Sequence, residues 1–335
     1  MHILLAGGTG FIGQHVAQQA LERGFELSLL VRRPQAAAAL RLQENGAVLV
    51  EGDLNDRASL DRAFAVVRPD VYMHSAGWYE LGLARARRQA MWNVNVTGLE
   101  HALGAAAQAG VERVLLTSST TAHGDTDDEL VAEGFQRRAP PRSWYEQTLV
   151  AARQVADRFL ARGLPLVIGS PAQVIGPGDH SAYGQLFRLY LRGLLPPLVW
   201  APQGAFSFVH VQDVARALLT LAERADPGQE YFISGSVMTN REMLSTWTRE
   251  LGRRTHFVWL PYPLALATGA AAAPLLRLFG QPAFISTEVV RSSYVSFRYS
   301  SERIQQAFGV RLRSAEQAWQ DTIRAERELL AERSG

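Results

Sequence analysis

Short apolar runs alternate with amphipathic segments along the first half of the chain. The apolar runs have the length of strands, and the segments between them, such as 14–23, 59–67 and 97–109, carry apolar residues at helical spacing. The predicted strands cover residues 3–6, 27–31, 47–51, 71–74, 114–118 and 166–169. Strands that alternate with helices in this way are typical of βαβ units. We therefore predict an α/β fold built on a doubly wound parallel sheet.

The regular alternation ends after Gly176. Loop signals follow at 176–179 and 195–197, whereas residues 208–224 and a predicted strand at 231–234 indicate a return to the sheet. We predict a first domain made of residues 1–176 and 208–234. Residues 177–207 and 235–335 are expected to form a smaller, mostly helical domain that binds substrate.

Residues 257–276 carry no charge, and this stretch is long enough to cross a bilayer. Pro261, Pro263, Gly269 and Pro274 interrupt it, however, and Arg277 follows directly. We therefore predict a buried helix pair in the smaller domain, with contact to a membrane surface as the alternative.

Composition narrows the class of partner. The chain has 335 residues, with 34 Lys+Arg against 32 Asp+Glu, so no strong net field favours nucleic acid, and a small-molecule substrate is expected. All 34 basic residues are arginine, which fits either a compositional bias of the source or deliberate removal of lysine. Cysteine is absent, which excludes disulfides and thiolate chemistry.

Two further expectations concern metal and location. The histidines show no spacing typical of a metal site, so no metal is predicted. Residues 1–5 run directly into a glycine-rich turn, with no basic segment or cleavage site of a signal peptide, so we expect a cytoplasmic protein.

A glycine-rich turn follows the first predicted strand and opens the first helix. It contains Gly7, Gly10 and Gly13, with Phe11 and Ile12 at the start of the helix. Glycines at this position allow a tight turn and close approach of the backbone to a pyrophosphate, whose charge is met by free N–H groups at the helix N-terminus. The sequence therefore predicts a Rossmann-type dinucleotide site.

The end of the second strand bears on the choice of dinucleotide. An acidic residue there would bind the ribose 2′-hydroxyl of NAD, but this chain has Arg32 and Arg33. Two guanidinium groups suit a 2′-phosphate, so NADP (as NADPH) is favoured, with NAD and a merely solvated charged turn as alternatives. Asp53, just after the third strand, is placed to accept a hydrogen bond from the adenine amino group.

Several ordered motifs accompany the glycine turn across most of the chain. They are 52–54 (GDL), 74–76 (HSA), 95–98 (NVTG), 116–119 (LTSS), Tyr145 at the head of a helix, 174–179 (VIGPGD) and 208–214 (FVHVQDV). In this order they resemble the extended short-chain dehydrogenase/reductase family, of the NAD-dependent epimerase/dehydratase type. Motifs 74–98 and 174–179 are most similar to its dihydroflavonol-reductase and hydroxysteroid-dehydrogenase branch.

The resemblance implies a nicotinamide enzyme in which Ser119 polarises the substrate carbonyl and Tyr145 transfers the proton. It also implies that members are often homodimers, joined through helices that include the helix of Tyr145. The positions that match the family's cofactor contacts, beyond those already named, are Leu54, Ser75, Ala76, Tyr145 and Pro171.

One position departs from the family pattern, which has a lysine four residues after the tyrosine. This chain has Leu149 there, although a cation on that face would lower the phenol pKa by about 1 to 3 units. Three interpretations follow: an arginine such as Arg142 or Arg153 replaces the lysine; cofactor binding persists with impaired catalysis; or the protein is a non-catalytic dinucleotide sensor.

Among enzymes, the alternative to a reductase is an NAD-dependent sugar-nucleotide epimerase or dehydratase. Such enzymes usually hold NAD, which Arg32 and Arg33 fit poorly. Trp78 and Tyr79 are placed to line the cleft at the strand ends. The second region is rich in aromatic residues, which favours NADPH-dependent reduction of a small hydrophobic carbonyl compound. These residues are Trp200, Phe206, Phe257, Trp259 and Tyr262.

Overall fold

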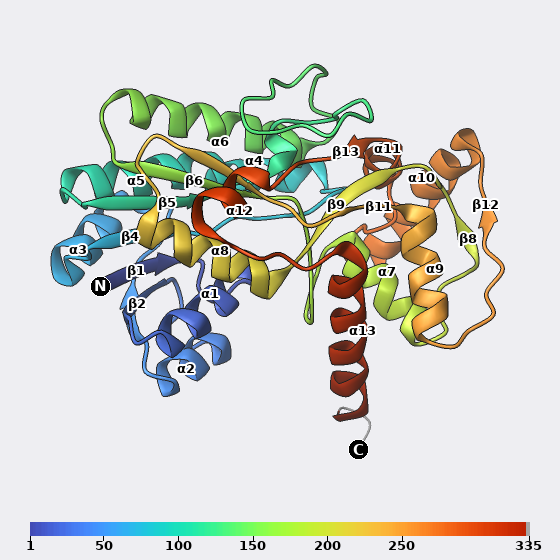
Figure 1. Ribbon diagram of the computed structural model, residues 1–335, viewed down its shortest axis with the longest axis horizontal. Coiled ribbons are helices and arrows are strands. Elements are labelled where there is room, and N and C mark those ends of the chain that lie inside the picture. The colour runs from blue at the N-terminus through green and yellow to red at the C-terminus, as the bar shows by residue number, and fades with distance from the viewer. Residues whose placement is uncertain (333–335) are drawn as a thin grey trace.

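The computed structural model describes residues 1–332, and its centre is a parallel sheet of seven strands. The strands lie in the order β10-β6-β5-β4-β1-β2-β3 (Figure 1). Their bounds are β1 His2–Ala6, β2 Glu26–Val31, β3 Val48–Glu51, β4 Val71–His74, β5 Arg113–Thr117, β6 Leu166–Pro171 and β10 Glu230–Ile233. The order reverses between β1 and β4, as in a doubly wound Rossmann sheet. The predicted α/β class and the six predicted strands are confirmed, each within two residues.

Helices cover both faces of this sheet (Figure 1). One face packs on α1 (Phe11–Glu22), α2 (Ala37–Glu44) and α8 (Val211–Arg224), and the other on α3 (Arg57–Val67), α5 (Gly98–Gln108) and α6 (Trp144–Ala161). The strand sequences explain the two layers. In β1, Ile3 and Leu5 enter one core while Leu4 and Ala6 enter the other, so a continuous apolar run buries both faces of the strand.

Shorter helices connect these layers. They are η1 (Arg85–Arg87), α4 (Arg88–Trp92), a π-helical turn η2 (Asn93–Thr97), η3 (Thr120–Ala122) and α12 (Glu302–Phe308).

A second region is built on small sheets. Strand β9 (Ala205–His210) pairs with β7 (Gln173–Ile175), β11 (Val237–Thr239) and β13 (Ser296–Phe297), and β8 (Leu198–Val199) pairs with β12 (Val258–Trp259). Its helices are α7 (Ala182–Leu191), α9 (Asn240–Glu250), α10 (Tyr262–Leu278), α11 (Thr287–Ser293) and α13 (Ala315–Glu332). Trp247 and Trp319 are fully buried at its core. The division into two domains at the stated residues stays a prediction.

The expected buried helix pair within 257–276 is wrong. Residues Tyr262–Leu278 form a single helix, α10, which continues through Pro274. Ala265, Gly269 and Ala273 are its buried residues, on one narrow face that packs against α11. Small residues allow close packing on that side, and the bulky side chains are left on the outside. No helix of residues 1–332 is both long enough and apolar enough to cross a bilayer.

Candidate functional site: a dinucleotide cleft joined to an apolar cavity

The glycine turn between β1 and α1 has no room for side chains. Gly7 has φ +83°, and a Cβ on it would lie 2.6 Å from the backbone of Ser75 and Ala76. A Cβ on Gly13 would lie 2.0 Å from the carbonyl oxygen of Gly7. Gly10 closes the turn, because its N–H donates to that same oxygen at 2.9 Å. The turn thus lies directly against the backbone that follows β4.

This turn borders a cleft at the carboxyl ends of β1, β4, β5 and β6. Its lining includes eight of the predicted site residues, namely Gly10, Phe11, Ile12, Ser75, Ala76, Ser119, Tyr145 and Pro171, and it also includes Trp78 and Tyr79. The first N–H groups of α1, which have no partner within the helix, begin at Phe11. A steric cradle and a helix N-terminus at a topological switch point fit the pyrophosphate of a dinucleotide.

The other predicted cofactor residues lie around this cleft. Arg32 lines its continuation beside Asn55 and Trp78. Arg32 and Arg33 are both exposed, and neither forms an ion pair with any residue in 1–332. Asp53 accepts a hydrogen bond from the N–H of Asn55. These contacts leave the assignment of Arg32, Arg33, Asp53 and Leu54 to cofactor binding a prediction.

Ser119 and Tyr145 both line the cleft, and each stands at the start of a helical segment. Ser119 caps η3, where its Oγ accepts from the N–H of Thr121 at 3.2 Å. Its own O–H donates to no residue within 1–332, so it is available to a ligand. Tyr145 is in the first turn of α6, which Ser143 caps by accepting from the N–H of Glu146. The ring of Tyr79 contacts that of Tyr145 edge-on, with centroids 4.8 Å apart.

The phenol of Tyr145 lies among groups that keep it protonated. Burial raises its pKa above the usual value of 10, and the negative charge of Glu146 raises it further. Leu149 lines the same cleft one helical turn later and carries no charge. Tyr145 is therefore a neutral group across the ordinary pH range.

Neither arginine considered as a replacement for the lysine lines the cleft. Arg142 pairs with Asp125 at 2.8 Å, and Arg153 pairs with Asp157 and with Glu230 of β10. Both guanidinium groups are thus held by carboxylates elsewhere. The interpretation in which an arginine acts at the phenol finds no support in these contacts.

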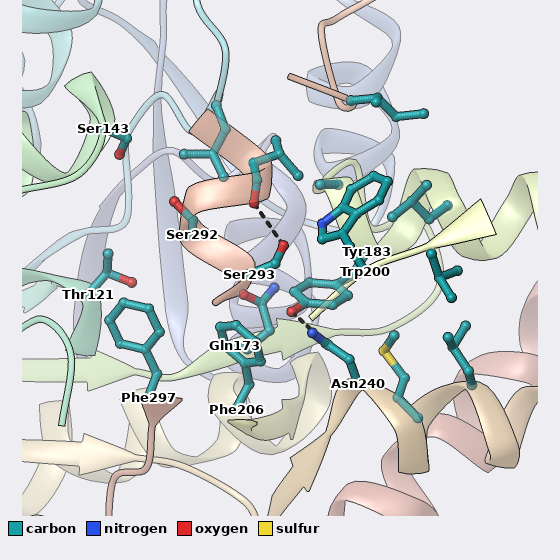
Figure 2. Close-up of a pocket in the computed structure, with 18 of the residues that line it drawn as sticks. Thr121, Ser143, Gln173, Tyr183, Trp200, Phe206, Asn240, Ser292, Ser293 and Phe297 are labelled. Carbon is teal, nitrogen blue, oxygen red and sulfur yellow. Dashed lines mark hydrogen bonds between the residues drawn. The ribbon is translucent and has the colours of Figure 1, made fainter. Parts of the chain in front are cut away.

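A second cavity of about 210 Å³ adjoins the cleft at Tyr145. Tyr79, Thr121, Tyr145 and Gln173 line both spaces. The rest of its wall comes mainly from α6, α7, β8, β9, α9, α10, α11 and β13, and Figure 2 shows rings such as Trp200, Phe206 and Phe297 within it. Some polar side chains in the wall are engaged with protein, whereas Ser292 Oγ and Trp247 Nε1 are buried without a hydrogen-bond partner among residues 1–332. Tyr183 bonds Asn240 at 3.2 Å, and Ser293 donates to the carbonyl oxygen of Val289 at 2.7 Å (Figure 2).

Glu146 is the one charged side chain in the described wall of this cavity. Its carboxylate accepts from Arg137 Nη1 at 3.1 Å and from the N–H of Arg142 at 3.0 Å. No arginine or histidine within residues 1–332 lines the cavity, and the chain has no lysine. A ligand here meets an apolar wall without a counter-ion for an anion.

Sequence reasoning located part of this cavity. Trp200 and Phe206 do line it, whereas Phe257, Trp259 and Tyr262 do not. Gln173 was missed although it lies between Pro171 and the motif that begins at Val174. Met243 and Trp247, which also line the cavity, come from α9 and carry no local signal that distinguishes a cavity wall from a core.

The fold and the cleft together define a Rossmann protein built to hold a dinucleotide. A family model described as the NAD dependent epimerase/dehydratase family matches residues 3–234. The chain therefore belongs to the NAD-dependent epimerase/dehydratase family, as its motifs predicted, and it is an NAD(P)-dependent oxidoreductase of that family.

Similar proteins agree with this assignment. The chain is 29% identical over 290 residues to sterol demethylase protein B of Methylococcus capsulatus, covering 83% of each chain. It is 28% identical to a candidate dihydroflavonol 4-reductase of Synechocystis sp., covering 95% of this chain and 92% of the relative. Among solved structures, gox2253 matches with a TM-score of 0.81 and 27% identity, covering 98% of both chains.

Proposed function

We propose that this protein uses NADPH to reduce an uncharged, hydrophobic carbonyl compound. The observation that carries the proposal is the cavity beside Tyr145, whose wall is apolar and whose one charged lining residue, Glu146, is already bonded to Arg137 and Arg142. An anionic substrate in this cavity would lose its hydration without gaining an ionic partner, which is costly. A neutral, apolar substrate loses little.

The same cavity argues against a sugar nucleotide. A nucleoside diphosphate carries charges that proteins usually bind with arginine, lysine or backbone donors. Arginine and histidine are missing from the described wall, and lysine from the whole chain. This favours the reductase over the epimerase or dehydratase alternative.

The groups placed to hold NADPH are the glycine turn and the two arginines of the β2 end. The backbone around Gly7 and the start of α1 suit the pyrophosphate. Arg32 and Arg33 form no ion pair within residues 1–332 and are cations suited to the 2′-phosphate. When bound, NADPH supplies the hydride for the carbonyl carbon.

Tyr145 and Ser119 act on the carbonyl oxygen. Tyr145 keeps its proton because burial and Glu146 raise its pKa, so it can donate that proton to the oxygen as negative charge develops there. The O–H of Ser119 donates a hydrogen bond to the same oxygen.

The leucine at position 149 sets the protonation state in which Tyr145 rests. Reduction starts from the protonated phenol, which is the form the site holds, since burial and Glu146 raise its pKa and Leu149 supplies no cation. The tyrosinate left after proton donation recovers its proton from solvent. Because reduction and oxidation share one transition state, the substitution changes the pH range of the reaction and not its direction.

NADPH oxidation with a panel of hydrophobic ketones and aldehydes tests this function. Turnover of an apolar ketone, with loss in Tyr145→Phe, is the expected result. Epimerisation of UDP-glucose without net NADPH consumption would replace it with the sugar-nucleotide alternative. Tight NADPH binding with no turnover in the native chain, but turnover in Leu149→Lys, would indicate a dinucleotide-binding protein with dismantled catalysis.

A further inference from the structure

Large exposed apolar side chains gather at one end of the molecule. They belong to β8, β12, α10 and the turn after α10, which lie together at the end opposite α3 (Figure 1). We call this surface the apolar end, and its principal residues are Leu198, Val258, Leu264, Leu275, Leu278 and Phe279. Leu278 is 78% exposed and Phe279 75% exposed. Exposed apolar groups that cluster in this way mark an interaction surface.

The two stretches of chain that build this end contain no acidic residue. None occurs between Asp179 and Asp213 or between Glu250 and Glu288, whereas arginines occur in both stretches. Arg254 precedes β12 by a few residues, and the guanidinium of Arg241 lies over Trp259 of β12. Both arginines are exposed, and neither forms an ion pair within residues 1–332. The surface therefore combines apolar side chains with two arginines that no carboxylate within residues 1–332 pairs with.

The apolar end is continuous with the cavity beside Tyr145. Leu198 of β8 is 47% exposed and also lines that cavity. Thr268 of α10 and Ile285, in the loop between α10 and α11, line it as well. The wall of the cavity and the exposed apolar surface thus share the same elements.

We propose that the apolar end docks on an anionic lipid bilayer, lying in its interface without crossing it. Apolar side chains of α10 enter the lipid while arginines face acidic headgroups, the arrangement by which interfacial helices bind membranes. Because the cavity is lined by the same elements, a lipid-soluble substrate can pass directly from the bilayer to Tyr145. This last step rests on the proposed function, but the docking itself does not.

Vesicle sedimentation tests the docking with no substrate or cofactor present. The full chain is mixed with phosphatidylcholine vesicles, with or without phosphatidylglycerol. We expect binding to the anionic vesicles, weakened by salt because the headgroup attraction is screened. Replacing Arg241 and Arg254 by glutamine should lower the partition coefficient about fivefold for each arginine.

A matched pair of variants separates docking from general hydrophobicity. Leu278→Glu places a charge on the apolar end, whereas Val66→Glu places one on α3 at an equally exposed apolar position, also 78% exposed. We expect Leu278→Glu to lower vesicle binding at least about tenfold and Val66→Glu to leave it unchanged. Neither residue lines the cavity or the cleft, so both variants should retain turnover of a water-soluble ketone.

Any of three results would overturn the proposal. The first two are absence of binding to anionic vesicles and equal loss of vesicle binding in the two glutamate variants. The third is a native dimer, seen by light scattering, that does not bind vesicles and that Leu278→Glu converts to a monomer. In that case a second copy of the chain would cover the apolar end.

Discussion

The cleft and the cavity meet at Tyr145, yet they are built in opposite ways. The cleft depends on backbone: a turn with no space for a Cβ at Gly7 or Gly13, and N–H groups at the start of α1. The cavity depends on side chains from elements spread along the chain between η3 and β13, and its wall is mostly apolar. The cleft therefore suits a charged dinucleotide, whereas the cavity selects which neutral substrate lies beside the phenol of Tyr145.

The largest effect should come from the group that the two spaces share. Tyr145→Phe removes the proton donor and should lower NADPH-dependent turnover about 10²- to 10⁴-fold, because the hydroxyl is lost while the ring remains. NADPH affinity, measured by fluorescence titration, should change little. Turnover that survives within about threefold would remove Tyr145 from the acid role.

On the cleft side, two glycines with similar backbone give a matched comparison. Gly7 and Gly24 have φ +83° and +75°, but a Cβ is blocked by Ser75 and Ala76 only at the first position and meets open space at the second. Both alanine variants pay about 1–2 kcal/mol of backbone strain. Gly7→Ala should in addition lower NADPH affinity at least about tenfold, since the backbone of the turn must move.

Equal NADPH affinity in the Gly7 and Gly24 variants would show that the close approach of the backbone after β4 to the turn has no part in binding.

Arg32→Gln and Arg33→Gln test what the cleft recognises beyond the pyrophosphate. Each charge-assisted hydrogen bond to a 2′-phosphate should be worth about 1.5–3 kcal/mol, so NADPH binding weakens at least about tenfold while NADH binding is unchanged. Arg41→Gln, at the end of α2, serves as the control for general charge. Parallel losses for NADPH and NADH would contradict the preference for NADPH.

On the cavity side, two tryptophans differ in where their rings lie. Trp200 lines the cavity, whereas Trp259 lies under Arg241 and outside it. Trp200→Ala should lower kcat/KM for a bulky apolar ketone about tenfold, with little effect on a small one, because apolar contact area is lost. Trp259→Ala should change kcat/KM for the two ketones by the same factor. A selective loss for the bulky ketone in both variants would show that the substrate does not bind in this cavity.

The smallest effect at neutral pH should follow Leu149→Lys. Since the pKa of Tyr145 is raised above 10, native reduction should stay level up to about pH 10, where the acid form still predominates. A lysine at position 149 should lower that pKa by about 1 to 3 units, which introduces an alkaline limb for reduction and increases alcohol oxidation. A native alkaline limb below pH 9 would mean that another cation acts on the phenol.

Much of the cleft could be predicted from sequence because its determinants are local. The run after β1 places three glycines at fixed spacing, and the apolar runs of β1, β2, β4, β5 and β6 are buried on both faces. The arginine pairings could not be predicted, since Arg153 meets Glu230, which lies 77 residues later. The cavity wall likewise joins residues from Tyr79 to Phe297, and no short pattern records such distant contacts.

The prediction of a buried helix pair in residues 257–276 was wrong for a different reason. Its lack of charge predicted burial, but the structure buries Ala265, Gly269 and Ala273 and leaves Leu264 and Leu275 exposed. A lack of charged residues indicates that a helix can lie in apolar surroundings, but it does not indicate which face of the helix is buried. Which side of α10 meets protein is decided by α11.

The most direct test of the central claim compares two ketones that share one skeleton. The claim is that the cavity takes an uncharged substrate because no cation lines it. NADPH oxidation is measured with 4-phenyl-2-butanone and with 4-(3-oxobutyl)benzoic acid, which differ by a single carboxylate. We predict a kcat/KM at least about 100-fold higher for the neutral ketone, equivalent to about 2.8 kcal/mol. Equal turnover of the two, or preference for the carboxylate, would contradict the account.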